Sequence, residues 1–174
     1  MRAFDDQPHL TDGVFSLRPL AASDRDPLHA AASDPLIWAG HPAKTRGERA
    51  EFDPYFDFLL ESGGALIIET AEGVAGCSRF YESPDIAGDI GIGYTFLTRA
   101  HWGGDANLRI KRLMLDHAFG WFDAVWFHIA PDNIRSRKAT AKIGAAFVDE
   151  GLFNLSDKDA EWARYRLTKQ AWAG

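Results

Sequence analysis

A predicted strand and a long predicted helix are joined by the stretch Thr98-Arg99-Ala100-His101-Trp102-Gly103-Gly104-Asp105-Ala106-Asn107. The strand covers residues 90–97, and the helix covers 107–122 with two adjoining apolar stripes. Glycines in such a loop let backbone N–H groups turn toward a ligand, and the helix dipole adds positive charge. The junction therefore predicts a phosphate-binding loop, with an ordinary strand-to-helix turn as the alternative. It matches neither GxGxxG nor GxxxxGK[ST], which disfavours dinucleotide dehydrogenases and P-loop kinases.

A second polar junction follows the next predicted strand, residues 124–130, and opens a basic helix over 133–143. It reads Asn133-Ile134-Arg135-Ser136-Arg137-Lys138, in which an N-cap residue and a hydroxyl stand beside three cations. Residues 99–142 contain eight of the 19 Lys and Arg residues and four of the 25 Asp and Glu residues, a local balance of +4 in a chain of net charge −6, which leaves −10 elsewhere. This asymmetry favours an anionic ligand here and a cationic one elsewhere, with a solvated surface helix as the alternative.

The rest of the pattern predicts one mixed α+β domain over residues 13–169, preceded by a loose polar leader, 1–12. Two glycines, Gly91 and Gly93, interrupt the strand 90–97 and indicate a bulge or a close approach by another group. Strict alternation along that strand would put Ile90, Ile92, Tyr94 and Phe96 on one face. Further strands are expected at 14–17, 65–70, 74–81, 146–152 and 164–168, and further helices at 23–33 and 45–62.

Composition excludes several classes of protein. No apolar run approaches the roughly 20 residues of a membrane helix, and the N-terminus has no apolar signal segment. Cys77 is the only cysteine, which predicts a reducing cytoplasm and no disulfide. The acidic net charge argues against a nucleic-acid partner, and the six histidines lack metal-binding spacing, so no metal is expected. His128 lies within a predicted strand, where core packing or a satisfied hydrogen bond is expected.

Together these stretches resemble the GNAT superfamily of N-acetyltransferases, specifically its ribosomal-protein-alanine acetyltransferase-like branch. The resemblance covers about residues 13–169, and the order and spacing of its motifs are fairly specific. The motifs are Leu17-Arg18-Pro19-Leu20, Asp34-Pro35-Leu36-Ile37-Trp38, Gly93-Tyr94-Thr95-Phe96-Leu97 leading into Trp102-Gly103-Gly104, and Asn133-Ile134-Arg135-Ser136 ending in Lys142-Ile143-Gly144-Ala145.

The resemblance implies a single GNAT-like domain with a mixed, mostly antiparallel, splayed sheet flanked by helices. It implies acetyl-CoA as cosubstrate, with transfer of the acetyl group by direct attack of a primary amine on the thioester. The acceptor is a small molecule or a protein N-terminus, and the protein is a monomer or homodimer. The expected coenzyme A contacts are Phe96, Leu97, Thr98, Trp102, Gly103, Gly104, Asp105, Ala106, Asn107, Lys111, Asn133, Arg135, Arg137 and Lys138.

Three positions depart from the family pattern. The phosphate loop usually reads Q/R-x-x-G-x-G/A, whereas Trp102, Asp105 and Asn107 stand at the aligned positions. Thr140 occupies the place of a common tyrosine acid, and Gly91 that of a common strand glutamate.

Other residues are therefore needed for proton transfer. Asp89, two residues before Gly91, is the expected general base, and Glu82 is the reserve. Ser136 is the expected acid by its place in the Asn-x-x-Ser motif. The alternatives are a strand-start carboxylate for Asp89 and a first-turn helix serine for Ser136.

The acceptor side is expected to include Trp38, His41 and Glu82. The alternative for Trp38 is an anchor packed beneath its loop. Two other functions stay open: a non-catalytic acyl-CoA-binding or sensing module, and a purely structural α+β domain.

Overall fold

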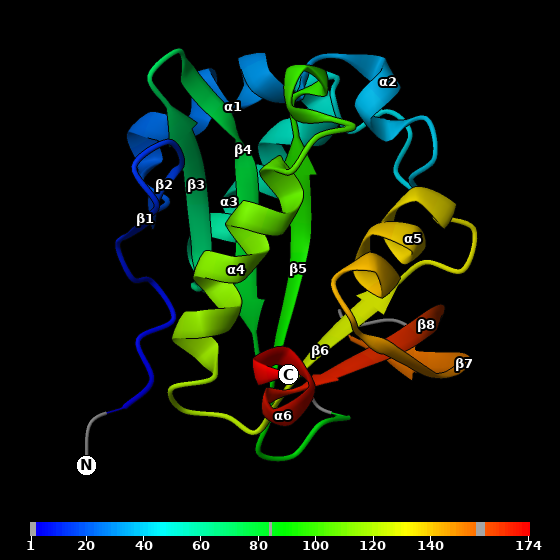
Figure 1. Cartoon of the computed structure of the whole chain (residues 1–174). Coiled ribbons are helices and arrows are strands. Elements are labelled where there is room, and N and C mark those ends of the chain that lie inside the picture. The colour runs from blue at the N-terminus through cyan, green and yellow to red at the C-terminus, as the bar shows by residue number, and fades with distance from the viewer. Residues whose placement is uncertain (1–2, 84, 156–158) are drawn as a thin grey trace.

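The computed structural model describes residues 3–83, 85–155 and 159–174 (Figure 1). Its elements are β1 (Leu10–Thr11), β2 (Ser16–Pro19), α1 (Arg25–Ala32), α2 (Pro35–Trp38), α3 (Arg49–Ser62), β3 (Ala65–Thr70), β4 (Gly73–Tyr81), β5 (Ile90–Leu97), α4 (Ala106–Ala118), β6 (Ala124–Ile129), α5 (Ile134–Lys142), β7 (Ala146–Asn154), β8 (Asp159–Thr168) and α6 (Lys169–Ala173), with 3-10 turns at Ala22–Asp24 and Arg99–His101.

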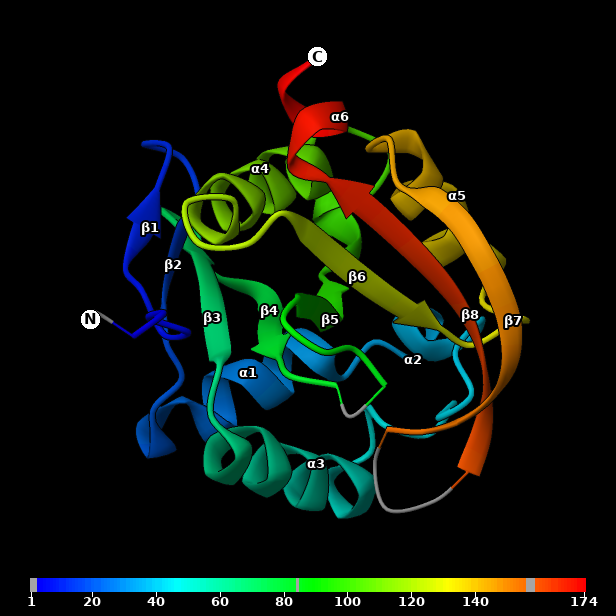
Figure 2. The same ribbon diagram turned by 90° about the horizontal axis from the view of Figure 1, so that it is seen from below.

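The described strands form one eight-stranded sheet in the order β1-β2-β3-β4-β5-β6-β8-β7. Neighbouring strands are antiparallel except β5 and β6, which run parallel. Helix α4 covers one side of β3 to β5, and α1 and α3 cover the other (Figure 2); we call these the α4 face and the α3 face. The arrangement confirms the expected α+β fold with a mixed, mostly antiparallel sheet flanked by helices.

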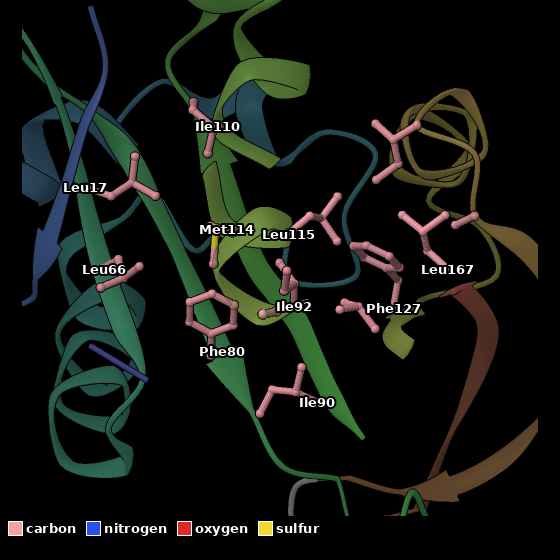
Figure 3. Close-up of a cluster of buried hydrophobic side chains, with 14 of the residues drawn as sticks. Leu17, Leu66, Phe80, Ile90, Ile92, Ile110, Met114, Leu115, Phe127 and Leu167 are labelled. Atoms are coloured by element: carbon pink, nitrogen blue, oxygen red, sulfur yellow. The ribbon is translucent and has the colours of Figure 1, made fainter. Parts of the chain in front are cut away.

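Two apolar cores hold the helices on the sheet. On the α4 face, Ile110, Met114 and Leu115 are fully buried in one cluster with Phe80 and Ile92 (Figure 3). Burying one such side chain contributes about 1.5–3 kcal/mol, so this stripe fixes α4 against the central strands. The core of the α3 face contains Leu28, Phe52, Phe56, Leu59 and Ile67.

A β-bulge interrupts β5. The step from Cys77 to Arg79 on β4 is matched by a longer step, from Phe96 to Gly93, on β5. Tyr94, inside the bulge, has a φ of 53°, a left-handed value that is uncommon for a residue other than glycine. The glycine pair therefore marked a bulge, as the sequence indicated.

Because of the bulge, the second half of β5 packs on the opposite face of the sheet from the one predicted. Ile90 and Ile92 lie in the core of the α4 face, but Phe96 lies in the core of the α3 face with Tyr94 packed against it. The extra residue shifts the alternation by one, so strict period-two reasoning fails beyond it.

Other differences lie at the ends of elements. The first 12 residues are not simply a loose leader, because Leu10 pairs with Leu17 and the Phe4 ring lies 4.9 Å from that of Phe122. The short helix α2 was not predicted. It begins at Pro35 with Asp34 as its N-cap, as expected for proline in a first turn. Strand β8 begins five residues earlier than predicted, at Asp159.

Candidate functional site

The parallel strands β5 and β6 are paired over a short length only. Ile90 pairs with Val125 and Gly91 with Trp126, and the described residues form no pair further along. The strands then diverge (Figure 1) and open a cleft of about 1980 Å³. Its walls come from α4 and α5 on one face, and from segment 38–46, α3, β4 and β8 on the other. The cleft thus gives a ligand access to both faces of the sheet.

The glycine-rich loop forms one end of the cleft. Gly103 adopts a φ of 76°, which favours glycine, and the side chain of Asp105 does not cap α4. The first N–H groups of a helix have no partner within that helix, so this end can receive an anion. The Trp102 indole donates to the Leu97 carbonyl oxygen at 3.0 Å. The guanidinium of Arg135 lies 3.8 Å from the centre of the Trp102 ring, which brings a cation to the loop.

Most of the expected coenzyme A contacts are brought together here. The cleft is lined by Phe96, Leu97, Trp102, Gly103, Gly104, Asp105, Asn107, Lys111, Asn133 and Arg135.

Four expected contacts lie outside this lining: Thr98, Ala106, Arg137 and Lys138. The Thr98 N–H donates to the Ala75 carbonyl at 2.8 Å, so it is not free for a ligand. Arg137 turns away to the Tyr165 hydroxyl, at 3.0 Å, and is therefore unsuited to a contact in the cleft.

The expected acceptor residues Trp38, His41 and Glu82 also line the cleft. Trp38 is 3% exposed and its indole donates to the Ala32 carbonyl at 2.8 Å, so it anchors its segment as well. Burial, together with the nearby Arg46 and Arg135, lowers the pKa of His41 to about 4. At neutral pH His41 is therefore uncharged.

A model of the acetyltransferase (GNAT) domain matches residues 15–146. The chain belongs to the GNAT acetyltransferase family. Its fold is similar to that of a GCN5-related N-acetyltransferase from Brucella melitensis, with a TM-score of 0.82 and 18% identity over 99% of this chain and 83% of that one. No curated protein sequence matches the chain.

Two further similar structures are complexes with ligands. One is Mycobacterium smegmatis RimJ in complex with CoA-disulfide, with a TM-score of 0.64 and 19% identity over 94% of this chain and 87% of that one. The other is spermidine N-acetyltransferase from Vibrio cholerae in complex with CoA and spermine, with a TM-score of 0.63 and 15% identity over 94% of this chain and all of that one (100%). GNAT relatives of this fold therefore bind coenzyme A, and one binds a polyamine.

Lys111 is buried in the GNAT cleft rather than extended toward its outer end. Its Nζ donates to Thr95 Oγ1 at 2.6 Å and to Ser78 Oγ at 3.4 Å. Among the described residues no carboxylate forms an ion pair with it, and burial lowers its pKa from 10.5 to about 7. The amine of this expected coenzyme A contact thus lies deep in the cleft, between α4 and the bulge.

The two expected catalytic residues of the GNAT chemistry are placed differently. Ser136 lines the cleft, and its N–H donates to the capping Asn133 Oδ1 at 3.3 Å. Asp89 does not line the cleft. Its Oδ2 accepts from the Trp126 indole at 3.0 Å and lies 3.9 Å from Arg166 Nη2. The carboxylate of Asp89 is therefore held by Trp126 near the end of the cleft where β5 and β6 are paired.

A polar chain that the sequence did not reveal lies on the α3 face of the cleft. The Tyr81 hydroxyl is 2.7 Å from His128 Nδ1, and His128 Nε2 is 3.2 Å from Asp85 Oδ2. Arg164 Nη1 donates to the same carboxylate oxygen at 2.8 Å. Tyr81 and His128 both line the cleft, so a hydrogen-bonded chain reaches from its wall to an ion pair. The signal in the sequence was the glycine pair at 91 and 93, which indicated a close approach.

Two other kinds of site are not found in the part of the chain that the structure describes. Within it, no helix is long and apolar enough to cross a membrane. The same residues contain no group of three or more His, Cys, Asp or Glu side chains that could hold a metal ion.

Proposed function

We propose that the protein transfers an acetyl group from acetyl-CoA to a primary amine, which attacks the thioester directly. The observation that carries this proposal is the cleft between β5 and β6, which opens to both faces of the sheet. A thioester can enter from the α4 face and an amine from the α3 face. Holding the two reactants in one desolvated cleft converts a bimolecular reaction into an effectively unimolecular one.

The cleft fits coenzyme A for two physical reasons. Beyond Gly91, β5 has no described partner on its β6 side, and an extended ligand with amide groups can pair with such an edge. Arg135 and the first turn of α4 offer positive charge for phosphates. Acetyl-CoA would supply the activated acyl group, and this chain would supply binding, orientation and proton transfer.

The acceptor is an amine that reaches the α3 face past segment 38–46. Glu82, an exposed carboxylate of the cleft, would attract an ammonium group before it loses its proton. Small-molecule amines and protein N-termini both satisfy this chemistry, including the N-terminal alanine that the resemblance to ribosomal-protein acetyltransferases implies. Ser136, on the other wall, is the candidate donor to the departing thiolate.

Calorimetry with coenzyme A tests the binding half of the proposal. Arg135→Ala should weaken binding by about 10- to 100-fold, because a hydrogen bond to a charged group contributes about 1.5–3 kcal/mol. The matched control is Arg137→Ala, two residues along α5 and outside the cleft, which should bind coenzyme A like the wild type. Absence of binding to the wild-type protein would overturn the proposal.

Mass spectrometry of reactions with acetyl-CoA tests the catalytic half. The amine panel should include a polyamine, free amino acids and a peptide with an N-terminal alanine. An acetylated product from at least one amine supports transfer. Tight binding of acetyl-CoA without product from any amine would favour the acyl-CoA-binding module instead.

A further inference from the structure

The Tyr81 ring occupies the position that the resemblance assigns to a strand glutamate. Tyr81 pairs with Gly91 in the sheet, and its ring lies over both glycines of β5. A Cβ atom added at Gly91 would lie 2.4 Å from Tyr81 Cζ, and one added at Gly93 would lie 3.0 Å from Tyr81 Cε1. Any side chain at position 91 would therefore displace the ring. The glycine at position 91 and the tyrosine at position 81 therefore depend on each other sterically.

The hydrogen bonds define which way a proton can move along this chain. Asp85 also accepts a hydrogen bond from Arg164, and ionised carboxylates only accept, so His128 Nε2 carries the proton toward Asp85. His128 Nδ1 is then unprotonated and accepts the Tyr81 hydroxyl. The free lone pairs of the Tyr81 oxygen remain available to a donor in the cleft.

We propose that the Tyr81 hydroxyl accepts the proton of the attacking amine and passes its own proton to His128. This inference deepens the proposed function and rests on it. The amine nitrogen forms a bond to the thioester carbonyl carbon, and the bond from that carbon to sulfur breaks. One N–H proton moves to Tyr81 Oη while the Tyr81 proton moves to His128 Nδ1. His128 then releases this proton to water, while Ser136 donates its hydroxyl proton to the coenzyme A thiolate and regains one from water, so the products are an amide and a thiol.

The surroundings of His128 suit a proton acceptor. Burial lowers its pKa, while Asp85 opposes that shift, so the ring is neutral at neutral pH. The other charged groups that face it are Arg164, which lowers the pKa, and Asp149, which raises it. Once the ring is protonated, Asp85 stabilises the imidazolium. Tyr81 is the catalytic residue in this scheme, and His128 and Asp85 are positioning residues that act through it.

The first test replaces the hydroxyl and keeps the ring. Tyr81→Phe should lower kcat by about 10²- to 10⁴-fold, the usual contribution of one general acid–base group. The matched control is Tyr165→Phe, which removes another buried tyrosine hydroxyl with a hydrogen bond of 3.0 Å and lies outside the cleft. The control should keep wild-type kcat. Coenzyme A affinity should be unchanged in both variants, which separates a chemical role from a loss of binding.

The pH–rate profile distinguishes a relay from a structural contact. Wild-type kcat should fall as the pH falls through the pKa of His128, because a protonated ring cannot accept. In His128→Gln that acid limb should disappear or move to the pKa of the amine. A kcat for Tyr81→Phe within about twofold of wild type, or an unchanged profile in His128→Gln, would overturn the proposal.

Nitrogen NMR of the histidine side chains provides a readout without turnover. In the unliganded wild type, His128 Nδ1 should be unprotonated and Nε2 protonated, and Tyr81→Phe should shift the Nδ1 signal. The opposite tautomer would refute the relay even if the enzyme is active. Conversely, a wild-type protein that acetylates no amine would refute the proposed function while leaving this hydrogen-bond assignment intact.

Discussion

Replacement of Lys111 by methionine should change how folding stability depends on pH. Burial lowers the pKa of Lys111 from 10.5 to about 7, whereas the unfolded chain keeps the ordinary value. Between these two pH values the unfolded state binds the additional proton, so stability rises with pH in the wild type. At about 1.36 kcal/mol for each pKa unit, burial costs about 4 kcal/mol at pH 7 and less than about 1 kcal/mol at pH 10.5.

The hydrogen bonds of Lys111 act in the opposite direction. Nζ donates to Thr95 and Ser78, and each bond contributes about 1 kcal/mol net. In Lys111→Met the two hydroxyls still bond to each other, at 2.7 Å. The variant should therefore be about 2 kcal/mol more stable than wild type near pH 7 and about 1–2 kcal/mol less stable near pH 10.5.

Urea unfolding at intervals from pH 7 to 10.5 measures this difference. Subtracting the free energy of unfolding of the variant from that of the wild type at each pH cancels the contributions of the ionisable groups that both proteins contain. Lys138→Met, an exposed residue of α5, controls for the loss of a surface charge and should give a flat difference. If the difference in the free energy of unfolding between wild type and Lys111→Met is also independent of pH, the claim that the buried amine destabilises the fold near pH 7 is refuted.

Three more substitutions follow from the contacts of the cleft. Asp89→Asn should leave kcat unchanged in steady-state assays, because this carboxylate binds Trp126 outside the cleft; a loss of about 10²-fold or more would restore it as the base. Trp38→Ala should lower the free energy of unfolding by about 3–5 kcal/mol in urea titrations, because the indole is almost wholly buried; a value under about 1 kcal/mol would contradict its role as an anchor. Gly91→Glu should lower the free energy of unfolding much more in the wild type than in the Tyr81→Ala variant, because the added side chain meets the Tyr81 ring. Equal losses in the two backgrounds, measured in a double-mutant cycle, would contradict this steric argument.

The sequence predicted those features that depend on neighbours along the chain. The hairpin β3–β4 has its turn at Ala71 and Glu72, and α4 buries the apolar stripe of Ile110 and Met114. The loop at Gly103 lies at the predicted strand-to-helix junction and lines the cleft, and its binding of an anion stays a prediction. Local turn chemistry and helical periodicity were sufficient for each of these.

The rest depended on contacts between distant segments. Tyr81 and His128 are 47 positions apart, and the Tyr81 ring lies across the glycines of β5, which brings its hydroxyl to the imidazole of His128. The period-two pattern could not reveal the bulge at Tyr94, because one additional residue changes the side on which Phe96 packs. Asp89 was a reasonable base by alternation alone, yet its carboxylate is engaged by Trp126 from the neighbouring strand.

The proton acceptor that we propose lies near the place of the family's strand glutamate but projects from a different strand. A glutamate at position 91 would project from β5 onto the α3 face, whereas Tyr81 projects onto the same region from β4. A tyrosine in this place changes the chemistry, because its hydroxyl is already protonated at neutral pH. It can accept the amine proton only if it passes its own proton to His128. It also couples the site to the ion pair of Asp85 and Arg164, which lies outside the cleft. Proton transfer in this enzyme should therefore respond to substitutions on β8, through Arg164, in a way that a strand glutamate would not.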